Sequence, residues 1–281
     1  KQQSVNSISV HEKRTKERRE ASSVLSSIVA SCIQNNTVFL DPEFPTTINS
    51  LYGSRFRELQ SKGKASVRKF GRARQARSAQ NIQNSQWVVF RGATPSPEDI
   101  QQGALGDCYF LSALACLAQR PHLIKRLFVG PTAEDLTNTT SQYGCYQVNL
   151  CKDGMWKVYT IDDMLPFHDN GCLAYTSGAR MQLWPSLLEK AFAKAHGSYG
   201  AIVSGQCSEA LSILTGSPTD SFRLSAPAAA ASSGGSGANA GYTLSMDNFQ
   251  QLFQTPTCCG SILRAISGWF RHGMCMSRSR W

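Results

Sequence analysis

The residues best suited to covalent chemistry surround Cys108, at the end of the segment Gln-Gly-Ala-Leu-Gly-Asp-Cys over 102–108. Residues 108–118 are apolar or small and predict a helix, and Asp107 is of a type that often caps a helix start. Cys108 is therefore expected in the first helical turn, where unpaired N–H groups and the helix dipole stabilise a thiolate. The same N–H groups can bind an oxyanion, and the Gln102 amide is a candidate second donor. This pattern predicts a nucleophilic thiol.

A buried structural cysteine that opens a core helix is the alternative interpretation of Cys108. The sequence has ten cysteines and no C-x-x-C pair, which gives little support to a zinc ribbon or a thioredoxin-like site. We expect the other nine to be buried apolar residues or free thiols. The polar, charged N-terminal stretch does not resemble a secretory signal, so we expect a cytoplasmic protein without a disulfide framework.

The elements that must position Cys108 are indicated by local patterns. Alternating residues over 145–150 and 155–161, joined by Lys152-Asp153-Gly154, predict a β-hairpin. An apolar-faced stretch over 183–195 predicts a helix, with a proline in its first turn. Shorter helices are expected over 122–128 and from Ser208 to Leu214, the latter ending at Gly216.

Composition divides the 281 residues into five stretches. They are a charged N-terminal helix over 1–37, a lead-in segment over 38–85 with a basic insertion over 55–77, a core lobe carrying the nucleophile over 86–224, a low-complexity linker over 225–241 and an unassigned basic tail over 242–281. The insertion has nine Lys or Arg and one Glu, and we expect it to be a solvated loop or disordered. Its two aromatic residues and the lack of a fold motif disfavour nucleic-acid binding. No apolar run approaches the ~18 residues of a membrane span.

Residues 102–110 closely resemble the calpain signature Q-G-x-L-G-D-C-W-F. Further stretches are similar to the same family; they lie at 38–45, 87–99, 152–166, 184–199 and 208–216. The residues of these stretches most resemble the small-optic-lobes (calpain-15-like) branch of the family. The resemblance implies an α+β fold: a papain-like cysteine protease first lobe, mainly helical with a small antiparallel sheet. It also implies Cys108 as the nucleophile, Gln102 in the oxyanion hole, and limited intracellular proteolysis of protein substrates.

Two positions depart from the family pattern. Tyr109 stands where the family usually has Trp, which exchanges one aromatic residue for another. Asp99 matches an acidic calcium ligand of the family, but Gln182 stands where a second acidic residue is often found. Loss of a carboxylate weakens a hard-cation site, so we do not expect this lobe to depend on calcium. Asp99 is kept as a candidate calcium ligand, and the sequence establishes no cofactor.

A catalytic base to accompany Cys108 is not recognisable in the sequence. A thiolate protease needs a histidine, which lies ~130–150 residues downstream of the cysteine in papain relatives. Residues 238–258 contain none, and the five histidines stand at 11, 122, 168, 196 and 272. His272 is at a usable distance, but its neighbours do not resemble the family's histidine strand. We therefore expect the second lobe to be missing and the chain to be inefficient alone.

Two other functions stay open at this level. The lobe could serve as a non-catalytic regulatory or binding module, because the face that normally meets the second lobe should be apolar. A zinc site is conceivable from ligand count alone at Cys258, Cys259, His272 and Cys275, although the spacing fits no usual pattern. The sequence does not indicate an oligomeric state.

Overall fold

The computed structural model describes residues 10–63, 65–77, 86–92, 94–129, 140–219, 223–224 and 243–244. The chain divides into two units, residues 1–216 and residues 217–281. In the second unit, strands β7 (Arg223–Leu224) and β8 (Thr243–Leu244) form a parallel pair. The predicted linker over 225–241 lies outside the described residues, as does the predicted tail over 242–281 apart from its residues in β8.

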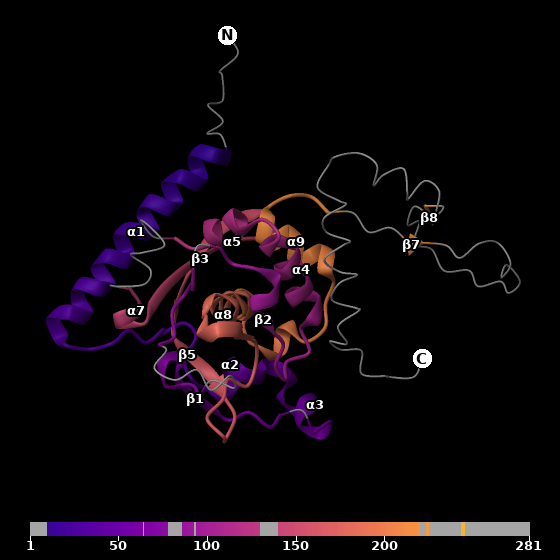
Figure 1. Cartoon of the computed structure of the whole chain (residues 1–281), viewed down its shortest axis with the longest axis horizontal. Coiled ribbons are helices and arrows are strands. Elements are labelled where there is room, and N and C mark those ends of the chain that lie inside the picture. The colour runs from indigo at the N-terminus through magenta and orange to yellow at the C-terminus, as the bar shows by residue number, and fades with distance from the viewer. Residues whose placement is uncertain are drawn as a thin grey trace, which may run out of the picture. The chain divides into compact units, whose positions relative to one another are not determined.

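Helix α8 (Trp184–His196) runs through the middle of the first unit, with the other elements around it (Figure 1). Pro185 occupies its first turn, where the missing N–H costs nothing, and Gly197 ends it in the left-handed conformation with φ of 93°. Residues 184–193 are all buried, including a glutamate and a lysine. The helix predicted over 183–195 is confirmed.

A long antiparallel hairpin packs beside α8. Strands β3 (Cys145–Lys152) and β4 (Met155–Asp162) pair along their whole length, with Lys152 opposite Met155. The two turn residues, Asp153 and Gly154, have φ of 53° and 74°, as a type I′ turn requires. Helices α1 (Val10–Asn35), α8 and α9 (Cys207–Thr215) all contact β3. The predicted hairpin is confirmed.

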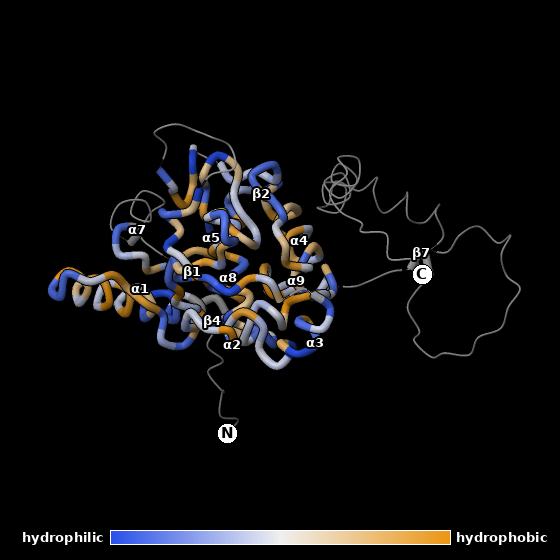
Figure 2. The backbone as a smooth tube through the Cα atoms, turned by 90° about the horizontal axis from the view of Figure 1, so that it is seen from below, coloured by the Kyte–Doolittle hydropathy of each residue, from blue (hydrophilic) through white to orange (hydrophobic). Residues whose placement is uncertain are grey.

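Helix α1 (Val10–Asn35) docks on this hairpin through its C-terminal half. Leu25 and Val29 are buried against Cys145 of β3. Nearer the N-terminus, the Arg18 guanidinium donates to the carbonyls of Arg126 (2.9 Å) and Phe128 (3.0 Å). Figure 2 shows α1 extending from the rest of the unit, with hydrophobic and hydrophilic residues alternating along it. A charged helix is therefore present in the stretch where the sequence predicts one.

The basic segment over 55–77 is folded over its described residues. Helices α2 (Ile48–Tyr52) and α3 (Phe56–Ser61) lead into strand β1 (Lys69–Arg72), which pairs antiparallel with β5 (Met164–Phe167). Leu59 and Val67 are buried, whereas many of the cationic side chains lie on the surface. The expectation of a loop or disordered segment is wrong here, because a few widely spaced apolar residues suffice to anchor it.

The remaining elements complete a mixed α and β unit. They are α4 (Cys108–Ala118), α5 (Pro121–Leu127), α7 (Thr140–Tyr143), α9 (Cys207–Thr215) and a short antiparallel pair of β2 (Ile100–Gln101) with β6 (Ser177–Gly178). Gly216 ends α9 in the left-handed conformation, as the sequence predicts. The described part of the first unit is mainly helical with small antiparallel sheets, which confirms the predicted α+β class.

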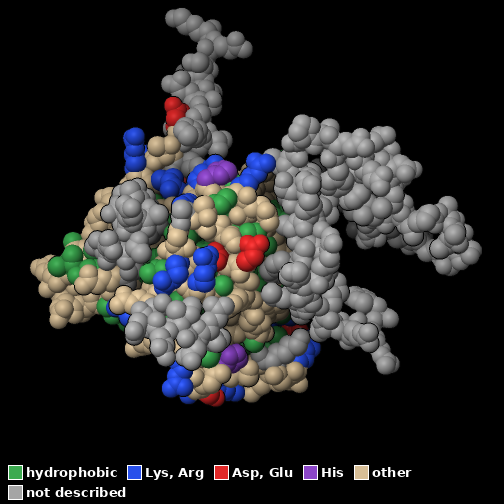
Figure 3. All heavy atoms as spheres, in the orientation of Figure 1, with side chains coloured by type: hydrophobic (Ala, Val, Ile, Leu, Met, Phe, Trp, Pro, Cys, Tyr) green, Lys and Arg blue, Asp and Glu red, His purple; other side chains and the backbone are tan. Residues whose placement is uncertain are grey.

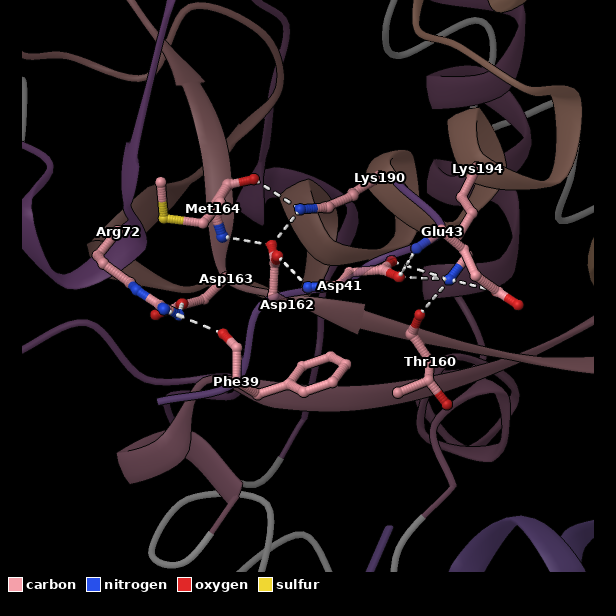
Figure 4. A network of polar contacts seen from close by, with 10 residues as sticks. All are labelled: Phe39, Asp41, Glu43, Arg72, Thr160, Asp162, Asp163, Met164, Lys190 and Lys194. Carbon is pink, nitrogen blue, oxygen red and sulfur yellow. Dashed lines mark hydrogen bonds and ion pairs between the residues drawn. The ribbon is translucent and has the colours of Figure 1, made fainter. Parts of the chain in front are cut away.

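Buried ion pairs tie α8 to the hairpin and to the segment before α2 (Figure 4). Lys190 pairs with Asp162 at the end of β4, and both side chains are almost completely buried. One turn later, Lys194 pairs with Asp41 at 2.8 Å. Asp162 also accepts the backbone N–H of Asp41 at 2.7 Å. The positive charges of α8 are thus satisfied inside the protein, and they fix its axis relative to β4.

Within the described ranges of the chain no helix could cross a membrane. None of the helices in those ranges combines the length and the apolar character needed to cross a membrane. On the face shown in Figure 3, Lys and Arg side chains lie in separate groups.

Candidate active site

Cys108 is the first residue of α4, where the sequence predicts it, and its side chain is exposed. Of the seven cysteines within the described ranges it is the one exposed thiol; Cys172 and Cys207 are half-buried and the other four are buried. A helix leaves its first N–H groups without intrahelical partners, so the thiol lies beside backbone donors. Exposure and position together suit a reactive thiol, and the structural interpretation of Cys108 as a buried core residue is wrong.

Helix α4 is held by its apolar face against α8. The Phe110 ring stacks on the Phe192 ring with centroids 4.3 Å apart, and Tyr109 meets the same ring edge-on at 6.4 Å. A Cβ at Gly205 would lie 2.5 Å from the Tyr109 ring, so the loop before α9 also packs closely on this residue. The first turn of α4 is therefore positioned by the two aromatic residues that follow Cys108.

The loop that leads to Cys108 is held between two other segments. Gly103 lies so close to the backbone at Tyr175 that an added Cβ would be 2.2 Å from the Tyr175 carbonyl oxygen. The next residue donates its N–H to the Ala174 carbonyl at 2.8 Å. On the other side, Ser204 donates its N–H to the Gly106 carbonyl at 2.9 Å. These contacts fix the backbone immediately before the nucleophile.

Gln102 stands at the end of β2, six residues before Cys108, and its side chain is half-buried. Its carbonyl oxygen Oε1 is buried and has no hydrogen-bond partner among the described residues. This oxygen is an acceptor, so an oxyanion would be bound by the other end of the amide, the Nε2 donor. The placement is compatible with an oxyanion donor, which stays a prediction for Gln102.

Asp107 occupies the N-cap position of α4, as predicted, but its side chain does not cap the helix. Instead its buried carboxyl group lies against that of Glu189, on α8. Burial raises the pKa of Asp107 to about 7 and raises that of Glu189 well above its ordinary value. Sequence reasoning missed Glu189, because a glutamate in an otherwise amphipathic helix is usually assigned to the solvent face.

Asp99 has two partners in this structure. One of its oxygens pairs with the Arg180 guanidinium at 2.6 Å, and the other accepts the Ser96 N–H at 3.0 Å. Gln182 accepts the Arg91 N–H at 2.9 Å, so its amide supports a neighbouring loop. No group of three or more His, Cys, Asp or Glu side chains suited to a metal occurs within the described ranges. A calcium ion at Asp99 would compete with the Arg180 guanidinium, and the role of Asp99 as a calcium ligand stays a prediction.

No histidine side chain in the described part of the chain is hydrogen-bonded to Cys108. His196 lies in the last turn of α8, where its Nδ1 contacts the Phe192 carbonyl at 2.8 Å, and burial lowers the pKa of His196. His122 lies in the first turn of α5 and His168 follows β5. The side chain of His11 and the whole of His272 lie outside the described residues, as do the cysteines of the conceivable C-terminal zinc site.

A pocket of about 290 Å³ borders the loop before Cys108. Its lining includes Tyr52, Leu59 and Val67 from the basic segment and the helix before it, together with Leu105 and Val203. No charged side chain lines this pocket. An apolar group bound there would lie beside the residues that lead to the nucleophile.

Comparison with known proteins agrees with this arrangement. The sequence model of the calpain family of cysteine proteases matches residues 39–257. The chain belongs to the calpain family. It is 35% identical to the calpain-1 catalytic subunits of Macaca fascicularis and Sus scrofa over 195 residues, and to that of Homo sapiens over 193 residues. These alignments cover 69% of this chain and 25% of each relative, so the chain spans about a quarter of the curated relatives it matches. The match to the family extends beyond residue 224, where sequence reasoning ends the core lobe.

Proposed function

We propose that this calpain-family chain contributes the nucleophile to cysteine-type endopeptidase chemistry on protein substrates, with Cys108 as the attacking residue. The observation that carries the proposal is the exposed thiol at the start of α4, beside the backbone N–H groups of the first helical turn. Low thiol pKa values are typical of this location, and the thiolate is the reactive form.

In the proposed reaction the Cys108 sulfur attacks the carbonyl carbon of a peptide bond, and the oxygen becomes negatively charged. Backbone N–H groups at the start of α4 and the Gln102 amide are the donors that would bind this oxyanion. Collapse of the intermediate expels the amine, which must receive a proton, and leaves an acyl group on sulfur. Water then releases the acid in a step that also requires a base.

The base for these proton transfers is not among the histidines described around the site. We therefore infer that this chain alone turns over peptides inefficiently; the alternative is a non-catalytic regulatory or binding module. We also propose that the protein is cytoplasmic. Within the calpain family, we propose that it is nearest to the small-optic-lobes branch, which is supported by the residue pattern of segments such as 184–199.

The proposal is tested by covalent labelling of the full chain. A peptidyl reagent with a mild thiol-directed group is added at pH 6 to 7, and modified cysteines are mapped by mass spectrometry, with Cys108→Ala as the control. Cys108 is expected to label far faster than the other nine cysteines. Equal labelling of Cys108 and the half-buried Cys172 would refute the nucleophile assignment and favour a binding module.

A further inference from the structure

Two acidic side chains are buried close together next to the nucleophile. Asp107, the residue before Cys108, has 0% and Glu189, on α8, has 1% of its surface exposed, and the two carboxyl groups interact electrostatically. Neither oxygen of Asp107 has a hydrogen-bond partner among the described residues. We call Asp107 and Glu189 the carboxyl pair.

The contacts of Glu189 determine how the carboxyl pair can be satisfied. Thr176 donates its N–H to both Glu189 oxygens, at 3.1 Å to Oε1 and 3.2 Å to Oε2, and its hydroxyl also donates to Oε1. Oε1 therefore accepts two hydrogen bonds from Thr176 and Oε2 accepts one. This leaves Oε2 as the atom better able to carry a proton that Asp107 can accept. Two buried carboxylates cannot both be charged at contact distance, because desolvation and mutual repulsion both oppose it.

The groups around the carboxyl pair do not supply a compensating positive charge. Tyr109 on α4, Tyr175 before β6 and Tyr199 after α8 face it, and burial raises the pKa of all three phenols, so they stay neutral. The ammonium group of Lys190, the next residue of α8, is committed to its ion pair at the end of β4. Because no cation among the described residues offsets their charge, a proton held between the two carboxyl groups removes the repulsion between them.

We propose that Glu189 is a positioning residue for Cys108: it stays protonated, donates a hydrogen bond to Asp107, and so fixes the start of α4 and places a titratable charge beside the thiol. This inference rests on the proposed role of Cys108 as nucleophile. As pH rises through neutrality, Asp107 releases its proton to solvent, and the new negative charge next to Cys108 disfavours the thiolate. The raised pKa of Asp107 agrees with ionisation in this range.

The experiment follows the rate of Cys108 alkylation by iodoacetamide from pH 5.5 to 9 in the full chain, with the site read by mass spectrometry. The wild-type profile should show a step near pH 7 in addition to the titration of the thiol. Asp107→Asn removes the titrating charge and should abolish the step, with alkylation about three- to tenfold faster than wild type at pH 8 and equal to it at pH 5.5. Asp169→Asn, at an exposed site, is the matched control and should leave the profile unchanged.

The role of Glu189 is tested by two substitutions. Glu189→Gln retains a neutral donor and should preserve the wild-type step, whereas Glu189→Ala removes the donor and should move the step to higher pH. A step that persists in Asp107→Asn, or a Glu189→Gln profile that matches Glu189→Ala, would overturn the proposal. If Glu189→Ala does not fold, the presence or absence of the step in Asp107→Asn decides whether the proposal stands. Alkylation reports the thiol itself, so this result is independent of whether the chain cleaves peptides.

Discussion

Replacing Lys190 with methionine should lower the free energy of unfolding by about 3 to 5 kcal/mol. Lys190 and Asp162 are 0% and 1% exposed, so the substitution leaves a carboxylate buried without its counter-charge. Asp162 would keep the backbone N–H groups of Asp41 (2.7 Å) and Met164 (2.8 Å), which places the expected loss at the lower end of that range. The lysine would also no longer donate to the Met164 carbonyl at 2.7 Å.

Urea unfolding followed by tryptophan fluorescence measures this loss. A double-mutant cycle with Asp162→Asn should show that the two losses are coupled by more than about 1 kcal/mol, because each substitution removes the same interaction. Lys16→Met is the control: Lys16 pairs with Glu20 on the surface, and the change should be within about 0.5 kcal/mol. A loss below about 1 kcal/mol for Lys190→Met, or losses that simply add, would refute the reasoning.

Three further predictions concern the surroundings of Cys108. Burial raises the folded-state pKa of Asp107 to about 7, whereas an aspartate in the unfolded chain titrates near about 4. The stability that the protonated Asp107 contributes is therefore present below about pH 4 and is lost as pH rises to about 7. In urea titrations across this window, the free energy of unfolding of the wild type should fall by up to about 4 kcal/mol relative to that of Asp107→Asn. Gly103→Ala should lower the melting temperature and slow Cys108 alkylation, since the new methyl group would meet the Tyr175 carbonyl; an unchanged melting temperature would contradict the close packing. Arg55→Ala should cost about 1 to 2 kcal/mol by removing a charged hydrogen bond of 2.8 Å to the Val203 carbonyl, and unchanged urea unfolding would argue against that bond.

The elements nearest the nucleophile could be predicted because their signals are local. A run of apolar and small residues after Gly106-Asp107 predicts α4 and places Cys108 in its first turn. The hairpin follows from the Asp153-Gly154 turn between alternating segments, and α8 follows from its apolar face and from Pro185 in its first turn. In each case one short stretch of sequence contains the whole signal.

What could not be predicted depends on contacts between residues far apart in the chain. The basic segment looks disordered in sequence because its apolar residues are sparse, and its order comes from pairing with β5, about 95 residues away. Glu189 and Lys190 look like solvent-facing residues of an amphipathic helix, yet both are buried because their partners come from other elements. Position alone predicts Asp107 as a helix cap, whereas its buried side chain does not cap α4 and interacts with Glu189 of α8.

The most direct test of the central claim is a single-turnover reaction with a peptidyl p-nitrophenyl ester. Attack by Cys108 forms a thioester and expels p-nitrophenolate, which is coloured, and this step needs less help from a base than hydrolysis of a peptide bond. The account predicts one equivalent of p-nitrophenolate, a persistent acyl group mapped to Cys108, a slower burst in Gln102→Ala and none in Cys108→Ala. An acyl group on another residue, or a burst that survives Cys108→Ala, would contradict it.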